Sequence, residues 1–419
     1  MPDSPRLGAP AVPPVTRMVN PVRDYDWGST SVLAHLQGRE PHGGPEAELW
    51  MGAHPGDPSM VTAADGARHS LLDLVTADPH GQLGVETVGR WGARLPFLLK
   101  ILAAEEPLSL QAHPSAEQAA AGFAKEEAVG LPRDAPTRNY PDPTAKPELL
   151  CALTEFHALA GFRDPEQTVR LLRMIETPGL SPFVDLLAAQ PDSDGLRALF
   201  TTWITLPQPA LDRLEPELLD ACVEHIRVHG EFELECRTIL QLGESYPGDA
   251  GVLAALLLNR LVLRPGEAIF LPAGNLHAYL HGAAVEILAN SDNILRGGLT
   301  PKHVDVPELL RVLDFRCGDM PVLRGEQIGR RWVYPTSAPE FELSRIEWPA
   351  GDDEEVPLAG GLPQIMICTS GAVDVAADGG AELTLRKGQS LWVPASDPKI
   401  VLRPSGEAGS QAFLATVGA

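Results

Sequence analysis

The hydrophobic and polar positions of this 419-residue chain change period twice. From about residue 18 to 160, short stretches of alternating apolar and polar residues are broken by Pro and Gly, which predicts β-strands joined by turns. From 161 to 256 the apolar positions follow a helical period, and from 257 onward the alternation returns. We therefore expect a mainly β protein with an α-helical insertion.

The helical segment opens with a clear start signal. Asp164 fits an N-cap, Pro165 fits the first helical position, and Gln167 fits the third position after the cap. The segment contains no catalytic motif and no metal-ligand spacing. Its further predicted helices, separated by Pro and Gly, cover about 193–205, 211–228, 233–242 and 251–261.

Composition narrows the possible partners. The chain is 44% hydrophobic, as in ordinary globular proteins, and its length predicts roughly three domains. It has no apolar run of about 18 residues, so no membrane span is expected. A net charge of −23 argues against nucleic acid and anionic membranes as partners.

Residues 1–17 are Pro-rich without an apolar segment, which favours a short disordered lead over a signal peptide.

The five cysteines are scattered and form no CxxC pair. This pattern favours free thiols in a reducing, cytoplasmic setting over disulfides or a thiolate metal site. They are Cys151, Cys222, Cys236, Cys317 and Cys368.

One predicted strand carries polar side chains on a single face. The stretch 95–115 has the pattern of strand, tight turn and strand, and Ser109, Gln111 and His113 share one face of the second strand. Such a face is either exposed to solvent or lines a polar site inside a barrel. Ser115 is predicted to cap the helix that follows.

A second strand, predicted over 146–153, places Lys146 and Glu148 on one face. The simpler interpretation is that both side chains lie at an exposed edge of the sheet. The alternative is a buried pair, which is costly unless the charges pair with each other or bind a metal.

The stretch 264–302 contains a recognisable motif. Its Gly266, Pro272, Gly274 and His277 have the spacing of the second cupin motif, although His281 stands where cupins often carry Asn. The β-forming residues around the Pro and Gly predict strand, turn and strand.

The residues after this motif add polar groups. A strand that points His277 inward also points Tyr279 inward, because side chains alternate. It leads into a polar loop, 290–303, that contains Gly and carries Arg296 and Lys302. Loops on rigid scaffolds are where chemistry tends to lie.

Residues 321–419 contain an internal echo of this motif. The segment 386–399 aligns without gaps with 264–277 and shares its Gly and Pro, but Lys399 stands in place of His277. A generic strand-turn-strand is the alternative explanation. We interpret the region as a degenerate cupin-like domain that has lost a metal-binding position.

These patterns predict four regions in the chain. They are a disordered lead (1–17), a cupin domain with a double-stranded β-helix or jelly-roll fold that carries the candidate site (18–160 plus 257–320), a helical insertion (161–256) and a C-terminal cupin-like domain (321–419).

Four potential metal ligands come from these β segments. Nitrogen and oxygen ligands without a thiolate suit Zn²⁺, with Mn²⁺ or Fe²⁺ as alternatives. A single carboxylate among neutral ligands leaves a net positive site, which favours anionic oxygens of a substrate. The four residues are Gln111, His113, Glu148 and His277.

The motifs resemble the type I phosphomannose isomerases. The similarity covers residues 18 to about 315 and lies in six segments: YDWGS, ELWMGAHP, LPFLLKILAAEEPLSLQAHPS, AKPELLCALTEF, LPAGNLHAYLHG and NSDNILRGGLTPKHVDVPELL. One residue departs from the pattern, because Ala145 stands where many members carry His before the lysine.

The resemblance implies a zinc-dependent cupin enzyme that interconverts mannose 6-phosphate and fructose 6-phosphate. It implies one Zn²⁺ per chain held by the four ligands above, with Arg296 as the catalytic arginine. Further residues match the lining of the family's active site: Lys100, Ser109, Lys146, Tyr279, Glu286, Asp292 and Lys302.

The implied reaction moves a proton between C1 and C2 through an enediol. A metal can polarise the carbonyl oxygen, and Arg296 can stabilise the developing charge or bind the phosphate. Lys100 and Lys302 would then supply a local basic island for the phosphate. The base stays open among Glu286, Asp292, neutral Lys146, His54 and a water activated by the metal.

Two other functions fit part of the sequence. A non-catalytic sugar-phosphate-binding cupin would keep the pocket, but it need not keep four ligands together with Arg296 and Lys302. An iron-dependent oxygenase would use two histidines and a carboxylate, which are present here too. The expected partner is a small sugar phosphate; the oligomeric state stays open, with a monomer as the default expectation.

Overall fold

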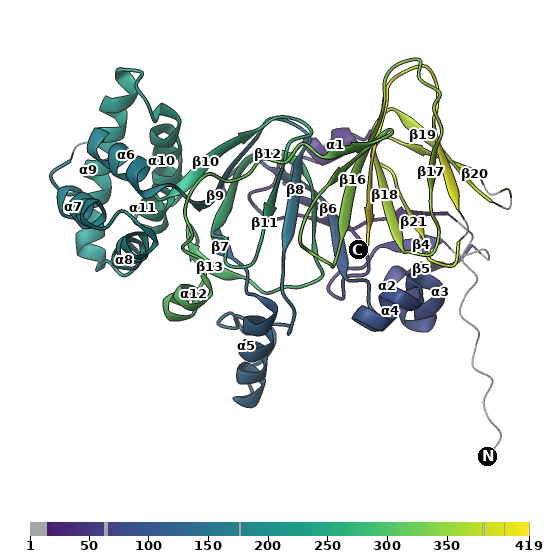
Figure 1. Ribbon diagram of the computed structural model, residues 1–419, viewed down its shortest axis with the longest axis horizontal. Helices are drawn as coiled ribbons and strands as arrows, with labels where there is room; N and C mark the ends of the chain where they lie inside the picture. Colours follow the sequence, from purple (N-terminus) through teal and green to yellow (C-terminus); the bar gives the residue numbers. More distant parts are fainter. Residues whose placement is uncertain are drawn as a thin grey trace.

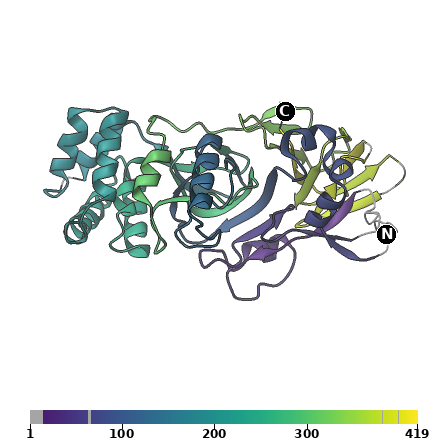
Figure 2. The ribbon, with the colours of Figure 1, turned by 90° about the horizontal axis from the view of Figure 1, so that it is seen from below.

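We describe the protein from a computed structural model that defines residues 15–62, 66–175, 177–378, 380, 382–397 and 399–418. A helical region, a middle β region and a C-terminal β region follow one another along the long axis (Figure 1). Figure 2 shows the same order from below. The predicted mainly β architecture with an α-helical insertion is confirmed, because helices α6 (Pro165–Met174) to α11 (Gly251–Ala255) lie between strands β9 (Phe156–Phe162) and β10 (Leu258–Leu263).

Strand β12 organises the middle sheet. It pairs antiparallel with β6 and β8 toward its C-terminal end and with β7 and β9 toward its N-terminal end. It therefore connects strands that lie far apart in sequence. The strands of this sheet are β2 (Val22–Arg23), β3 (Glu48–Met51), β6 (Phe97–Ala104), β7 (Leu110–Ala112), β8 (Glu148–Ala152), β9 (Phe156–Phe162), β10 (Leu258–Leu263), β11 (Ala268–Leu271), β12 (His277–Ala289) and β13 (Leu295–Gly298).

The C-terminal region contains a nine-stranded and a four-stranded sheet within the described residues. The larger sheet has the order β14 (Glu326–Ile328), β15 (Arg331–Tyr334), β16 (Glu342–Trp348), β23 (Ser410–Thr416), β18 (Gln364–Ser370), β21 (Ser390–Val393), β1 (Thr16–Val19), β4 (Met60–Thr62) and β5 (Arg68–Ser70). The smaller has the order β17 (Val356–Leu358), β22 (Ile400–Pro404), β19 (Ala372–Ala377) and β20 (Glu382–Arg386).

The larger sheet departs from the predicted division of the chain. Strands β1, β4 and β5 come from the N-terminal region but extend the C-terminal sheet, because β1 pairs antiparallel with β21, Thr16 opposite Trp392. A pairing across so many residues leaves no local signal in the sequence. The predicted lead 1–17 is also too long by at least two residues, since β1 begins at Thr16; residues 1–14 lie outside the described part.

The helices of the described residues are mostly where the sequence places them. Asp164 caps α6 by accepting from Gln167 N, and Ser115 caps α5 in the same way through Gln118 N. The helices are α1 (Val32–Leu36), α2 (Leu71–Ala77), α3 (Pro79–Leu83), α4 (Val85–Trp91), α5 (Ala116–Ala128), α6 (Pro165–Met174), α7 (Ser181–Ala189), α8 (Ser193–Ile204), α9 (Gln208–Arg227), α10 (Glu233–Ser245), α11 (Gly251–Ala255) and α12 (Val306–Val312).

One helix prediction is wrong in its second half. The helix expected over 251–261 ends with α11 at Ala255, and β10 begins at Leu258. The continuous apolar run in this stretch fits a buried helix and a buried strand equally well. Pairing with β9 along the whole of β10 decides for the strand.

The internal echo of the sequence has a structural counterpart. β11 and β21 occupy aligned positions, and each follows a turn whose glycine has a positive φ, +85° at Gly266 and +79° at Gly388. A Cβ at Gly388 would lie 2.3 Å from Leu36 O, so a side chain is excluded there. The two strand-turn-strand units are therefore alike in conformation as well as in sequence.

The two β regions share one hydrophobic core. Buried side chains of the middle sheet, such as Ile101 and Val285, belong to the same cluster as Ile367 and Phe413 of the C-terminal sheet. The middle sheet is consequently fixed against the C-terminal region, while its other end carries the polar residues described next. Among the described residues, no helix is both long and apolar enough to cross a membrane.

Candidate metal centre and its surroundings

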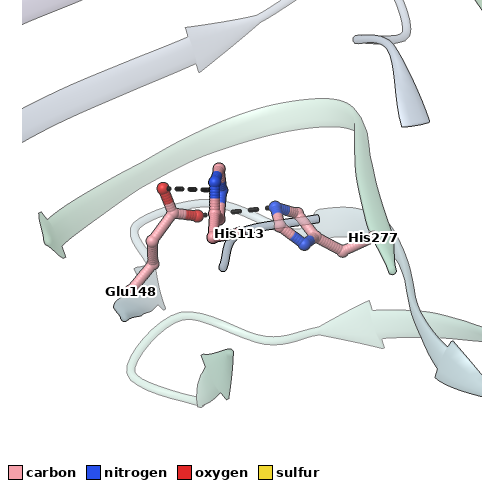
Figure 3. A group of neighbouring side chains, drawn as sticks. All are labelled: His113, Glu148 and His277. Carbon is pink, nitrogen blue, oxygen red and sulfur yellow. Dashed lines mark ion pairs between the residues drawn. The ribbon is translucent and has the colours of Figure 1, made fainter. Parts of the chain in front are cut away.

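Two histidines and a glutamate converge inside the middle β region. His113 follows β7, Glu148 begins β8 and His277 begins β12, and all three side chains are buried. His113 Nε2 lies 3.2 Å from Glu148 Oε1, and His277 Nε2 lies 3.4 Å from Glu148 Oε2. Figure 3 shows the carboxylate facing both rings. Their ligand atoms all lie within 4.8 Å of one another, close enough to hold one metal ion.

Backbone carbonyls fix the tautomer of both histidines. His113 Nδ1 lies 2.8 Å from Asn293 O, and His277 Nδ1 lies 3.1 Å from Asn275 O. A carbonyl oxygen only accepts, so each Nδ1 carries the proton and each Nε2 presents a lone pair. Both Nε2 atoms are buried without a hydrogen-bond partner among the described residues. Two lone pairs facing a carboxylate need a cation between them, so the donor set fits Zn²⁺.

The surroundings keep these groups in the charge state that metal binding requires. Burial lowers the pKa of His113 to about 4, so the ring is neutral at pH 7. Burial disfavours ionised Glu148, but nearby charge, that of Lys146 included, holds the pKa of this carboxyl well below its usual value. Lys146 Nζ lies 3.2 Å from Glu148 Oε1 and is itself buried. The alternative of an exposed edge for Lys146 and Glu148 is therefore wrong.

The backbone of Gln111 lies between two strands that carry other candidate site residues. On β7 it lies opposite His277 of β12 on one side and opposite Arg296 of β13 on the other. Its side chain is half-buried and makes no hydrogen bond within the described part of the chain. Its role as a metal ligand stays a prediction.

A buried chain of paired charges lies beside the three ligands. Lys100 Nζ lies 3.3 Å from Glu48 Oε1 and 3.6 Å from Glu286 Oε2. Tyr279 donates its hydroxyl to Glu286 Oε1 (2.8 Å), and Trp50 donates Nε1–H to Glu48 Oε2 (2.6 Å). Burial raises the pKa of Glu286 to about 7. Strands β3, β6 and β12 place these groups side by side, with Lys100 opposite both Trp50 and Glu286.

Glu48 and Trp50 are site neighbours that the sequence did not single out. Both lie on β3, in the segment ELWMGAHP that resembles the family, but no role was predicted for either residue. The available signal was their spacing of two, which puts them on one face, but only the pairing of β3 with β6 brings them to Lys100.

A hydrogen-bonded clamp joins the loop before β8 to the loop after β12. Asp142 Oδ2 accepts from Ser291 Oγ (3.0 Å) and from Asp292 N (2.8 Å). Asn293 donates Nδ2–H to the carbonyl oxygens of Asp142 and Thr144, both at 2.8 Å. Because Asn293 O also holds the His113 ring, the clamp orients a metal ligand through the backbone.

Arg296 and Lys302 are the unpaired cations of the neighbourhood. Arg296 is half-buried, and its guanidinium has no hydrogen bond or ion pair among the described residues; burial lowers its pKa. Lys302 is exposed, and its ammonium has no partner there either. Ser109 is half-buried, with no side-chain hydrogen bond in that same part of the chain.

Known proteins resemble this chain over almost its whole length. Residues 15–165 match the family described as phosphomannose isomerase type I, catalytic domain. Mannose-6-phosphate isomerase of Escherichia coli (strain K12) is 38% identical over 93% of this chain and 97% of its own length. The chain belongs to the type I phosphomannose isomerase family. The human enzyme of that name is 32% identical over 87% of this chain and 89% of its own length.

Solved structures of phosphomannose isomerases agree with this assignment. A variant of the Salmonella typhimurium enzyme has a TM-score of 0.87 at 33% identity, covering 97% of this chain and all of its own. A mannose 6-phosphate isomerase structure bound with zinc and yttrium has a TM-score of 0.86 at the same identity and coverage. The resemblance identified from the sequence motifs is thus confirmed.

Because the clamp orients His113, a substitution within it should weaken zinc binding although it removes no metal ligand. Asp142→Ala removes the acceptor for Ser291 and Asp292 and loosens the carbonyl that orients His113. We expect the affinity for Zn²⁺, measured by competition with a chromophoric chelator, to fall about 10- to 100-fold. Asp185→Ala, at an exposed position on α7, is the matched control and should leave the affinity unchanged. Equal affinities of both variants would contradict the role of the clamp.

Proposed function

We propose that this chain interconverts mannose 6-phosphate and fructose 6-phosphate, with one Zn²⁺ per chain held by Gln111, His113, Glu148 and His277. The observation that carries the proposal is the convergence of two neutral imidazole nitrogens and one carboxylate beside an unpaired arginine. Its support comes from relatives named mannose-6-phosphate isomerase that match nearly the whole chain.

Zn²⁺ at this position would act as a Lewis acid on an oxygen of the substrate, which stabilises developing charge by several kcal/mol. The residues of the chain set the conditions for that step. Nδ1–H of His113 and His277 is held by backbone carbonyls, so neither ring can rotate away from the ion. Burial of the three ligands excludes water from their side of the site.

The phosphate is assigned to Lys302, and Arg296 to the charge that develops on the substrate oxygens. Both cations lack a carboxylate partner among the described residues, and Arg296 lies opposite Gln111 in the β7–β13 pair. The sequence-based expectation that Lys100 adds to this basic island finds no support, because its ammonium is buried between Glu48 and Glu286. Two free cations in a chain of net charge −23 make a local site for a dianion.

The isomerisation requires a proton to leave C2 and another to arrive at C1 through an enediol. Negative charge that develops on the substrate oxygens meets the guanidinium of Arg296, which is always protonated. Tyr279 donates its hydroxyl to Glu286, so it forms a wall of the site rather than a proton donor to substrate.

The finer architecture remains part of the proposal. We assign the middle sheet to a catalytic cupin domain, residues 165–255 to an inserted helical domain and the C-terminal sheets to a cupin-like domain. The matching turns at Gly266 and Gly388 support a duplicated unit. A cytoplasmic location and a monomer stay predictions; all five cysteines lie in the described residues and are free thiols, which suits a reducing compartment.

The two alternative functions lose support. A non-catalytic sugar-phosphate-binding cupin and an iron-dependent oxygenase are each compatible with the metal ligands alone. Neither accounts for full-length similarity to proteins named as isomerases in bacteria, plants and mammals.

Removal of one ligand tests the metal role. His277→Ala should lose stoichiometric zinc, measured by elemental analysis, and with it turnover of mannose 6-phosphate in a coupled assay. His281→Ala lies on the same strand, β12, but is exposed, and it should keep both. An alanine variant at 277 that loses zinc and still isomerises at the parent rate would rule out the role of the metal.

Removal of the arginine separates charge stabilisation from metal binding. Arg296→Ala should retain one zinc per chain but lose at least about 100-fold in turnover, the lower range for a positioned electrostatic donor. Arg296→Lys keeps a cation and should recover part of the loss. Near-normal turnover of the alanine variant would exclude Arg296 from the reaction.

A further inference from the structure

The helical region meets the candidate site at the turn between its last two helices. α10 ends at Ser245, and the chain then turns through Gly248, whose φ is +76°. It restarts as α11, which packs against β13. We call residues 246–251 the insertion turn. The turn brings the side chain of Asp249 to the segment that follows Arg296.

Asp249 joins the two parts of the chain through both of its carboxylate oxygens. Oδ1 accepts from the backbone N–H of Gly251 at 2.7 Å, which closes the insertion turn. Oδ2 accepts from the backbone N–H of Thr300 at 3.0 Å. Thr300 Oγ1 in turn accepts from the backbone N–H of Lys302 at 3.1 Å. Connected hydrogen bonds thus lead from the helical region to the residue assigned to the phosphate.

The segment 298–302 has little other support for its backbone. The pairing of β13 with β7 ends at Gly298, opposite Leu110, so the sheet does not extend to Lys302. Within the described residues, 300–302 make no backbone–backbone hydrogen bond. The path of this segment therefore depends on the acceptor that Asp249 offers.

Close packing between the two backbones makes this attachment specific. A Cβ on Gly298 would lie 2.7 Å from Cα of Gly251, and a Cβ on Gly251 would lie 2.6 Å from the backbone nitrogen of Leu299. Leu299 is buried with a φ of +54°, a left-handed conformation that leucine rarely adopts. Such a conformation persists only where its surroundings determine it. The insertion turn supplies backbone contacts on both sides of Leu299, at Gly298 and at Thr300.

A second residue of the insertion turn holds another segment of the site. Tyr246 donates its hydroxyl to the carbonyl oxygen of Pro107 at 2.6 Å. Pro107 precedes Ser109 by two residues, and Ser109 is one of the predicted substrate residues. The turn is therefore attached to the chain on both sides of the β7–β13 pair.

We propose that Asp249 is a positioning residue for phosphate recognition: it fixes the backbone of 298–302, and with it the position from which Lys302 reaches the phosphate. This assignment rests on the isomerase function and the role of Lys302 proposed above. It gives the helical region, which contains none of the proposed metal ligands, a part in substrate binding. Because Asp249 acts on the segment that binds the phosphate, its loss should weaken binding of the sugar phosphate and spare the chemical step.

Substitution of Asp249 tests this role by separating KM from kcat. Asp249→Ala should raise KM for mannose 6-phosphate about 5- to 20-fold, with kcat within about twofold of the parent and one zinc retained. Asp249→Asn keeps one acceptor oxygen and should give a smaller increase. Asp192→Ala is the matched control, because Asp192 also accepts from two backbone N–H groups of the helical region, at the start of α8. It should leave KM unchanged.

A pair of substitutions at position 300 tests the same connection without changing the helical region, and it applies even if Asp249→Ala does not fold. Thr300→Ser keeps the hydroxyl that accepts from Lys302, whereas Thr300→Val keeps the shape and removes the acceptor. We expect KM of the Ser variant within about twofold of the parent and KM of the Val variant about fivefold higher. In a Lys302→Ala background, Asp249→Ala should raise KM by less than about twofold, because the group it positions is absent.

Several results would overturn the inference while the isomerase function stands. They are an unchanged KM in Asp249→Ala, a loss of kcat without a change in KM, an equal effect of Asp192→Ala, and a full further increase in KM in the Lys302→Ala background. Equal KM values of the Ser and Val variants at position 300 would contradict the connection to Lys302.

Binding without turnover distinguishes this inference from the proposed function. A parent protein that binds zinc but does not convert mannose 6-phosphate overturns the proposed function. The Kd of fructose 6-phosphate, measured by calorimetry on the zinc-loaded parent, Asp249→Ala and Asp192→Ala, still tests the positioning role. A Kd raised about 5- to 20-fold in Asp249→Ala alone supports it. Equal Kd values in the three proteins overturn it, and a parent that does not bind fructose 6-phosphate overturns both proposals.

Discussion

Two backbone hydrogen bonds determine what the centre of this molecule can do. The backbone carbonyls of Asn293 and Asn275 accept hydrogen bonds from Nδ1–H of His113 and His277. The Nε2 lone pairs of both rings therefore face the carboxylate of Glu148. Buried lone pairs next to a buried carboxylate are unfavourable without a cation. The remaining features either hold these carbonyls in place or arrange charges around the ion.

The loops that supply the carbonyls also carry the reactive groups. Asn293 is fixed by the clamp to Asp142 and Thr144, in the segment that leads to Lys146 and Glu148. Its neighbour Asp292 faces His54. A few hydrogen bonds thus couple the orientation of the ligand His113 to the position of Asp292 and to the segment that precedes β8. The site thus follows a common arrangement in which loops on a rigid sheet carry the functional groups.

The sequence predicted the parts of the site that have local signals. Alternation on β7 and the Gly, Pro and His spacing before β12 pointed to His113 and His277, which the structure brings together with Glu148. Family motifs pointed to Lys100, Tyr279 and Glu286, which form one buried network. Gln111 lies between His277 and Arg296 in the strand pairing, and its role as a metal ligand stays a prediction from the alternation on β7 and from the family pattern.

What the sequence could not predict depends on pairing between distant strands. β1 joins the C-terminal sheet through β21, and β3 brings Glu48 to Lys100, although neither pairing has a local pattern. The burial of Lys100 between the carboxylates of Glu48 and Glu286 also follows from strand pairing, and its predicted role at the phosphate stays a prediction. The largely apolar stretch 251–261 fits either helix or strand, so only the pairing of its second half with β9 could decide.

The central claim is that His113, Glu148 and His277 grip one zinc ion. Anomalous scattering at the zinc edge, from crystals of the zinc-loaded protein, tests it most directly. We expect a single strong peak about 2.0–2.2 Å from both Nε2 atoms and from a Glu148 oxygen. Stoichiometric zinc bound at any other position, with these three side chains left unligated, would contradict it.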